Sequence, residues 1–589
     1  DLGMRNVFTD TPYKNFNLSV TGAFSASVTE AIRTKPNAHT ISDTLRWIKG
    51  RHEMTMGFEY RKQTLDKNFR WLLDPAMTFD GSFSGSGIAD FFLGKPSLLD
   101  EMAYGEIGVQ EFPVYIGFLQ DNIKVTPKLT LNLGVRYEPT IPYRDLGNRV
   151  SVFRPGVKSQ VFVNAPTGLL FVGDPGVPER GTEADMNNFA PRAGFAWAVA
   201  KRTSIRSAYG IFYDSSPMSA ITNAFQGVAP FGTRLRVRPP LGPFEDPFLG
   251  KNPFPMPFPP PKDIAFPQGL AAATWPDRYT TGYIQSWHFT IEREVIADWL
   301  VRIAYAGSKG TKLLQGEQLN PPLYIPGQST ASNINLRRPY GPTFDTITLV
   351  NSVGSSNYNS LQLTLDKRFS KGLTLQSNYT WGKSIDFGSG GGTQWPSLTP
   401  GNASYDRGLS DFHHAHRFVS SGLWELPGLK ERTALLKWVL GGWQASGAMI
   451  LQSGAAFSVQ AGRDNTLTGF GNRANLVGDP SRAARTDPNR DPVLEWFNTK
   501  AFAHNSPGVY GNSGRNIIFG PGLANVDFAV SKHFPVTERV RLQFRSEFFN
   551  LLNHANFNEP NSTLTSGTYG RITSAMDPRI LQFALKLMF

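Results

Sequence analysis

The sequence contains no cysteine, so disulfide bonds, thiolate metal sites and cysteine nucleophiles are excluded. It also lacks any run of about 18 to 20 consecutive apolar residues, the length that a membrane-spanning helix requires. The opening segment, DLGMRNVFTD, does not have the charged and apolar regions of a secretory signal peptide. A disulfide-stapled scaffold and a helical membrane protein are therefore both excluded.

Charged residues are scarce as well. They form 18% of the chain against 12% aromatic residues, and Gly (57) and Pro (43) together exceed one residue in six. This composition argues against a helical bundle and indicates many strands joined by turns. The net charge of +12 is scattered along the chain without a block of Lys and Arg. We therefore expect no nucleic-acid partner.

Apolar and polar side chains alternate over long stretches, as on the two faces of a strand. The last segment, ILQFALKLMF, places five large apolar residues on one face: Leu581, Phe583, Leu585, Leu587 and Phe589. Three other segments, LTLNLGVRYE, LQLTLDKR and VRLQFRSEF, carry charged residues on the opposite face: Arg136, Glu138, Asp366, Arg368, Arg541, Arg545 and Glu547. A β-sandwich and a membrane barrel both produce this alternation, so the pattern alone does not distinguish them.

The lengths of the connections do distinguish them. We predict strands over residues 39–50, 51–62, 113–125, 128–140, 189–199, 203–213, 281–294, 299–309, 355–369, 373–386, 412–426, 439–453, 523–534, 539–552 and 579–589. Every second connection is a tight turn, with one longer exception at 427–438, and the others run from about 25 to about 69 residues. All short turns then lie at one end of the strands. This sorting predicts an all-β, antiparallel outer-membrane β-barrel with short periplasmic turns and long extracellular loops.

The number of strands gives a further expectation. If the last strand ends in the periplasm, counting back requires an outward strand before residue 39, and 15–26 is the candidate. The chain would then show about 16 strands with both termini periplasmic. Every backbone group in lipid must pair within a closed sheet, so the final strand must be as long and as lipid-facing as the others.

Several segments, read in order, resemble the barrel of Oar-like TonB-dependent receptors. They include NIKVTPKLTLNLGVRYEP, SIRSAYGIFYD, NYNSLQLTLDKRFSKGLTLQSNYTWGKSID, YDRGLSDFHHAHRFV and ERVRLQFRSEFFNLLNHANF, and the resemblance covers most of residues 39–589. It implies a 22-stranded barrel, occluded by an N-terminal plug and driven by the TonB complex of the inner membrane. The chain shows no plug and no TonB-contacting box before residue 39. We therefore expect the C-terminal barrel portion of a longer receptor, with residues 1–38 as a lead-in that holds the first visible strand and 39–589 as the barrel.

The resemblance also implies a function. We expect a protein of the bacterial outer membrane, not an enzyme and without a cofactor, that takes up a large scarce solute such as a glycan, peptide or metal chelate. Its expected partners are outer-membrane lipid, the barrel-assembly machinery that reads the C-terminal alternation, the TonB complex through the missing plug, and an unknown extracellular ligand. Two alternatives remain: a plugless, 16-stranded passive porin, and a surface-binding barrel that presents long loops.

Individual residues give weaker predictions. The charged residues of the alternating strands would line the lumen and contact the plug or the passing substrate. The alternative is that they have no specific role, because a water-filled or plug-filled interior needs polar residues in any case. In DFHHAHRF, His414 and His416 share a strand face and Asp411 is near, which makes a weak metal candidate beside the more ordinary structural role. Asp464 and Asn465 offer oxygen ligands without the carboxylate density that calcium usually requires. We expect no resident metal.

Overall fold

The computed structural model describes residues 16–28, 33–69, 75–102, 106–214, 228–253, 256, 259–389, 402–427, 439, 441–537 and 540–589. Within these ranges, no helix has the length and apolar character needed to cross a membrane.

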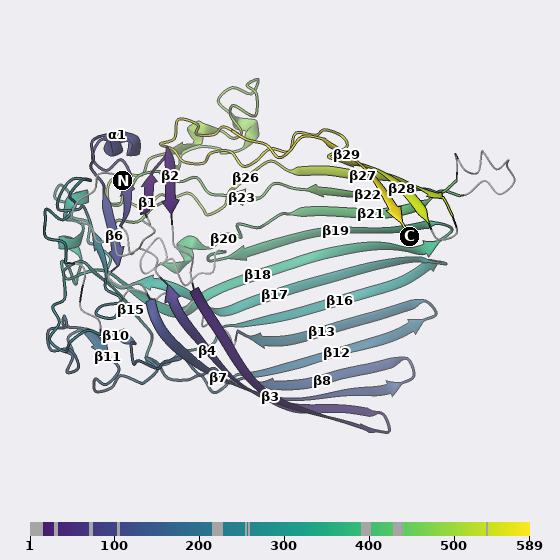
Figure 1. The fold of residues 1–589 in the computed structure, drawn as a ribbon, viewed down its shortest axis with the longest axis horizontal. Helices are drawn as coiled ribbons and strands as arrows, with labels where there is room; N and C mark the ends of the chain where they lie inside the picture. The colour runs from purple at the N-terminus through teal and green to yellow at the C-terminus, as the bar shows by residue number, and fades with distance from the viewer. Residues whose placement is uncertain are drawn as a thin grey trace.

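The wall of the molecule is one antiparallel sheet whose long strands lie side by side (Figure 1). Fifteen long strands of the described residues form it: β3 (Arg33–Lys49), β4 (His52–Phe69), β7 (Glu106–Thr126), β8 (Leu129–Tyr137), β12 (Phe189–Ala200), β13 (Thr203–Tyr213), β16 (Tyr283–Ile296), β17 (Trp299–Gln318), β18 (Phe344–Ser370), β19 (Leu373–Asp386), β21 (His416–Glu425), β22 (Trp443–Gln452), β27 (Leu523–Pro535), β28 (Arg541–Phe549) and β29 (Ile580–Met588). Each pairs with the next in antiparallel register. Fifteen of the predicted strands are thus confirmed.

The short turns lie together at one end of the wall, on the right in Figure 1. Two residues suffice to join β12 to β13, β16 to β17, and β18 to β19. Arg202 (φ 62°), Asp298 (φ 69°) and Gly372 (φ 78°) adopt the left-handed backbone that tight hairpin turns require. The predicted sorting of turns and loops is confirmed. The longer connection predicted at 427–438 falls almost entirely outside the described residues.

The predicted apolar stripes point outward from the wall. Leu133 is 45% exposed, Ile303 47% and Phe583 64%, although all are large and apolar. The register carries the stripe from strand to strand, because Ile303 pairs with Leu363 and Leu363 pairs with Tyr379. Such a continuous exposed apolar belt matches a surface in contact with lipid rather than water.

One predicted strand is wrong. Residues 15–26 do not cross the wall but divide into β1 (Phe16–Val20) and β2 (Phe24–Val28), a hairpin that turns at Gly22 (φ 77°). β1 also pairs, in parallel, with β5 (Ala76–Phe79). The apolar side chains of β1, Leu18 and Val20, are buried against Phe79 and Leu99 instead of facing outward. The alternation in this segment therefore arises from a half-buried hairpin. The wall begins with β3, which starts at Arg33 rather than at the predicted residue 39.

The two edges of the wall are not joined to each other in the described residues. β3 pairs there only with β4, and β29 only with β28. Because neighbouring strands alternate in direction, the first and the last of fifteen run the same way. Two strands that run in the same direction cannot complete an antiparallel sheet by pairing directly.

The long connections gather at the opposite end of the wall, on the left in Figure 1. We name them the loop cap: the described residues of 16–28, 75–102, 138–188, 228–282, 319–343, 387–415, 453–522 and 550–579. Its strands and its α-helix are β1, β2, β5, α1 (Gly87–Phe92), β6 (Leu98–Met102), β9 (Arg144–Asp145), β10 (Ser151–Phe153), β11 (Leu169–Phe171), β14 (Arg234–Val237), β15 (Leu270–Thr274), β20 (Gly408–Leu409), β23 (Ala456–Phe457), β24 (Asn475–Leu476), β25 (Phe502–Ala503) and β26 (Ile518–Phe519). Five short 3-10 helices of its described residues accompany them: η1 (Ala331–Asn333), η2 (Asn335–Arg337), η3 (Ala403–Asp406), η4 (Arg482–Ala484) and η5 (Thr499–Ala501).

The loop cap contains most of the buried hydrophobic residues that the structure describes. Four clusters are centred on Phe171, Phe79, Phe497 and Trp275, and each draws mainly on residues of the long connections. The proline-rich segment 252–261 is only partly described, and its Met256 packs against the cluster of Phe79. The long connections are therefore folded together rather than extended into solvent.

Candidate ligand-binding pocket

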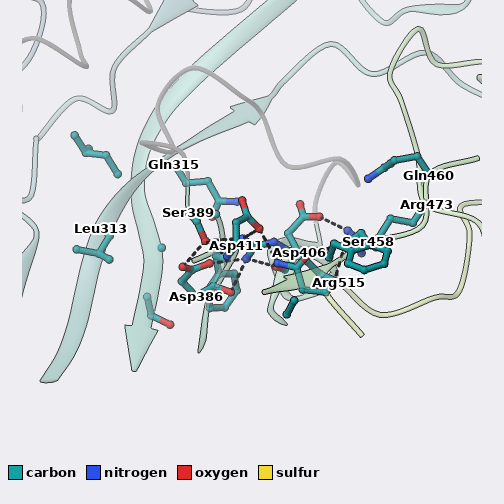
Figure 2. Close-up of a pocket in the computed structure, with 18 of the residues that line it drawn as sticks. Leu313, Gln315, Asp386, Ser389, Asp406, Asp411, Ser458, Gln460, Arg473 and Arg515 are labelled. Carbon is teal, nitrogen blue, oxygen red and sulfur yellow. Dashed lines mark hydrogen bonds and ion pairs between the residues drawn. The ribbon is translucent and has the colours of Figure 1, made fainter. Parts of the chain in front are cut away.

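A cavity of about 540 Å³ lies where the loop cap meets the wall (Figure 2). Residues of β17, β18 and β19 form one side, and the connections 387–415, 453–522 and 550–579 form the others. Asp386, the last residue of β19, pairs with Ser356 on the face that also carries Gln362. That face is opposite to the outward apolar stripe of Leu363. The pocket therefore opens on the inner face of the wall.

Arg515 ties the connection 453–522 to the wall. Its guanidinium donates to Asp386 Oδ1 at 2.5 Å, to Asp411 Oδ1 at 2.8 Å and to the Ser389 hydroxyl at 2.8 Å. Burial alone would lower the pKa of Arg515, but its bonds to the two carboxylates outweigh burial and raise it. The guanidinium remains charged, with its terminal nitrogens engaged.

Arg473 links the connection 453–522 to the connection 387–415. Its side chain is 2% exposed and donates to Asp406 Oδ1 at 3.0 Å, to the Tyr405 carbonyl at 2.5 Å and to the Ser513 carbonyl at 3.0 Å. The guanidinium also lies 3.8 Å from the centre of the Tyr405 ring. All three of its nitrogens are occupied by protein acceptors.

Two polar side chains of the pocket are not engaged in this way. Gln315 of β17 is 5% exposed, and its Oε1 accepts no hydrogen bond from any described residue. Glu559 lines the same cavity, and within the described part of the chain it forms no ion pair or side-chain hydrogen bond. Partial desolvation and then the charge of Asp411 raise the pKa of Glu559, while His414 opposes the shift.

A separate network of buried charges lies deeper in the loop cap. In β14, Arg234 and Arg236 share a face and meet Asp100 of β6, while Arg236 also approaches Asp345. Arg338 donates to Asp345 at 2.9 Å with both side chains fully buried. Burial first, and then the positive charge of Arg238, lower the pKa of Arg236 to about 10. This network links β14 to its neighbour β6 and, through Asp345, to β18, and none of its residues lines the pocket.

The sequence decides the family. Residues 2–582 match the family described as Outer membrane beta barrel domain. The chain belongs to the outer membrane beta barrel domain family. The outward apolar belt of the wall is thus a lipid-facing surface, and the protein lies in the bacterial outer membrane.

Solved structures resemble this outer membrane barrel at low identity. The outer membrane transporter YddB from Escherichia coli is 10% identical with a TM-score of 0.49, and the match covers 98% of this chain and 58% of that one. The siderophore receptor PiuA from Acinetobacter baumannii is 11% identical with a TM-score of 0.41, covering 96% and 57%. The chain thus spans somewhat more than half the length of each. No curated protein matches the sequence.

The predicted lumen residues lie on the inner face of the barrel wall but do not form one site. Arg136 belongs to β8 and Glu138 directly follows that strand, while the others belong to β18 and β28; these three strands are not neighbours. Arg136 forms an ion pair with Glu138, and Arg545 forms one with Glu547 at 2.7 Å. Asp366, Arg368 and Arg541 lie near the short turns.

The weak metal candidates are also separated. Asp411 is engaged by Arg515, His414 donates through Nδ1 to the Ser453 carbonyl at 2.7 Å, and His416 bonds to the Tyr379 hydroxyl at 2.8 Å. His416 stacks on Trp381 on the outer face of the barrel. Among the described residues, no three His, Asp or Glu side chains form a metal-binding group.

Asp464 and Asn465, the weak calcium candidates, serve the fold of their own loop. Asp464 accepts from the Thr466 hydroxyl at 2.5 Å and from the Gly469 amide at 2.6 Å. Burial raises the pKa of Asp464. Asn465 donates to the Asn505 carbonyl at 2.8 Å.

Sequence reasoning identified one member of the pocket, Asp411, and assigned it to a different chemistry. It missed Gln315 of β17, Arg473 and Arg515 of the connection 453–522, and Glu559 of the connection 550–579. A usable signal was present, because both arginines stand in polar loop segments, GNRAN and SGRNI, where a charged residue without a local partner must find one from another loop.

Proposed function

We propose that this chain supplies the C-terminal wall and the loop cap of an Oar-like TonB-dependent receptor. The receptor takes up a large scarce solute, a glycan, a peptide or a metal chelate, by energy-coupled transport. The observation that carries this proposal is the folded loop cap with a pocket at the inner face of the wall. A receptor needs a solute site on the extracellular side of its channel, and in this proposal the pocket at the loop-cap end of the wall is that site. The protein has no catalytic role in this proposal and needs no cofactor.

The open seam between β3 and β29 supports a larger barrel. Unpaired backbone groups at two long edges are too costly in lipid, where no water replaces the lost hydrogen bonds. Because β3 and β29 run in the same direction, an antiparallel wall closes only when an odd number of further strands fills the seam. A 22-stranded barrel meets this condition with seven further strands, which is the count expected of Oar-like receptors.

The remaining roles follow from the same proposal. The inner-face residues Arg136, Glu138, Asp366, Arg368, Arg541, Arg545 and Glu547 contact the plug or the passing solute. The C-terminal stripe of Leu581, Phe583, Leu585, Leu587 and Phe589 is read by the barrel-assembly machinery. The TonB complex acts through a plug that is not in this chain.

A surface-binding barrel is the second candidate. It is favoured by the buried clusters of the loop cap, because loops that pack together can present a fixed surface to a binding partner. A passive porin is less favoured, because folded loops over one end would obstruct free diffusion.

Uptake measurements separate the three functions. Radiolabelled oligopeptides, glycans and ferric chelates are supplied at low concentration to the parent strain, to a strain without the receptor and to a strain without TonB. We expect uptake of one solute class to fall to background in both deletion strains. Uptake that persists without TonB would indicate a porin. Solute binding at the cell surface without any uptake would indicate a surface-binding barrel.

A further inference from the structure

We propose that the pocket behind the loop cap binds its solute through a protonated amino group. This proposal rests on the receptor function given above and makes its substrate class more specific. The cavity, at about 540 Å³, is within the roughly 300–1,000 Å³ that is typical of small-molecule sites. Its walls come from three connections and three strands, so distant parts of the chain must fold together to form it.

The charge of the pocket is negative even though the chain as a whole is basic. Four carboxylates line it, those of Asp386, Asp406, Asp411 and Glu559. Among the described residues of the pocket, two guanidiniums face them, those of Arg473 and Arg515. The excess of carboxylates attracts a cation and repels an anion.

The two arginines are not available to an anionic ligand. Arg515 already holds Asp386 and Asp411, and Arg473 holds Asp406 together with two backbone carbonyls. An anion would have to displace these carboxylates, and the two that are buried, Asp386 and Asp406, would then lose these guanidinium partners. Recognition of a phosphate, a carboxylate or an anionic chelate is therefore disfavoured at this position.

Two acceptors of the pocket have no donor among the described residues. Glu559 presents a carboxylate, and Gln315 presents a buried amide oxygen without a donor. Leaving such an oxygen unsatisfied is unfavourable, and a ligand donor would offset that cost. An ammonium group supplies three donors and no acceptor, so it complements both side chains.

Two kinds of solute carry this group: a peptide with free amines and a deacetylated amino sugar. Their shared chemistry is the protonated amine, and the test distinguishes the sources. The probes are trilysine and the glucosamine trimer, each compared with its fully N-acetylated form. Binding to the full-length receptor in lipid nanodiscs is measured by isothermal titration calorimetry.

We expect at least one free-amine probe to bind and its acetylated form to bind much more weakly. Glu559→Gln should reduce affinity for that probe on the order of tenfold, the effect of one hydrogen bond to a charged group. Glu245→Gln is the matched control, because Glu245 is an exposed residue of another connection and does not line the pocket. It should leave affinity unchanged.

A second variant protects the test against misfolding. Gln315→Met keeps the side-chain volume, removes the amide and should weaken binding of the same probe several-fold while the heat-modifiable gel mobility of the barrel stays normal. Equal binding of free and acetylated probes, or unchanged affinity in both Glu559→Gln and Gln315→Met, would overturn the proposal.

The two proposals fail in different ways. If a free-amine probe binds but no solute is taken up with TonB dependence, the receptor function is wrong and the amine site stands. If uptake depends on TonB but serves an anionic chelate and no amine binds, the amine site is wrong and the receptor function stands.

Discussion

Replacing Arg473 with methionine is expected to destabilise the loop cap by about 3–5 kcal/mol, the usual cost of removing one partner from a buried ion pair. The guanidinium is 2% exposed and joins the connection 453–522 to Asp406 and Tyr405 of the connection 387–415. Methionine fills much of the space but offers no donor, so Asp406 loses its counter-charge and two backbone carbonyls lose a hydrogen bond. We expect faster hydrogen exchange across residues 453–522, with the wall strands unchanged.

The control for this variant is Arg490→Met, at an exposed position in the same connection. It removes the same charge without breaking a buried contact and should change exchange little. The double variant Arg473→Met with Asp406→Leu should recover part of the lost stability, because no buried carboxylate is then left behind. Normal exchange in Arg473→Met would contradict the assignment of this arginine as a tie between connections.

Replacing Phe583 with arginine is expected to destabilise the inserted barrel by about 2–4 kcal/mol, the range for a charge on the lipid face near the midplane. Phe583 lies midway along β29, is 64% exposed and belongs to the outward stripe. The cost arises because the guanidinium must leave water for hydrocarbon. The free energy of unfolding in urea, measured in lipid vesicles, reports the loss.

The matched control is the neighbouring inner-face residue. Gln582 pairs in register with Glu547 of β28, so an arginine at 582 gains a carboxylate neighbour on the wet side of the wall. Gln582→Arg should change the free energy of unfolding little. Equal destabilisation by Gln582→Arg and Phe583→Arg would mean that both faces of β29 contact the same environment, which would contradict one face in lipid and the other in water.

The wall could be predicted from the sequence because its signals are local. Alternation identifies each strand, and a two-residue turn such as Lys201–Arg202 fixes which strands are neighbours. The same rule failed at 15–26 because a hairpin of two short half-buried strands has the same alternation as one long strand. The turn at Gly22, with φ 77°, was the feature that separated the two cases.

The loop cap and its pocket could not be predicted in the same way. Arg473 meets Asp406 across 67 positions, and Arg515 meets Asp386 across 129. Contacts of this kind depend on how the wall brings distant connections to one end, which no periodic pattern encodes. Sequence reasoning therefore gave Asp411 a weak metal role, whereas the structure places it in an ion pair with Arg515.

The most direct test of the account uses the absence of cysteine, which lets single cysteines be labelled without removing native ones. Fluorescent probes are placed at Leu133 and Asn132 of β8, and at Leu363 and Gln362 of β18, in the receptor inserted in vesicles of spin-labelled lipid. The account predicts strong quenching at Leu133 and Leu363 and weak quenching at Asn132 and Gln362, because only the first pair faces hydrocarbon. Equal quenching at neighbouring positions, or quenching confined to Asn132 and Gln362, would contradict a wall that turns its apolar face to lipid.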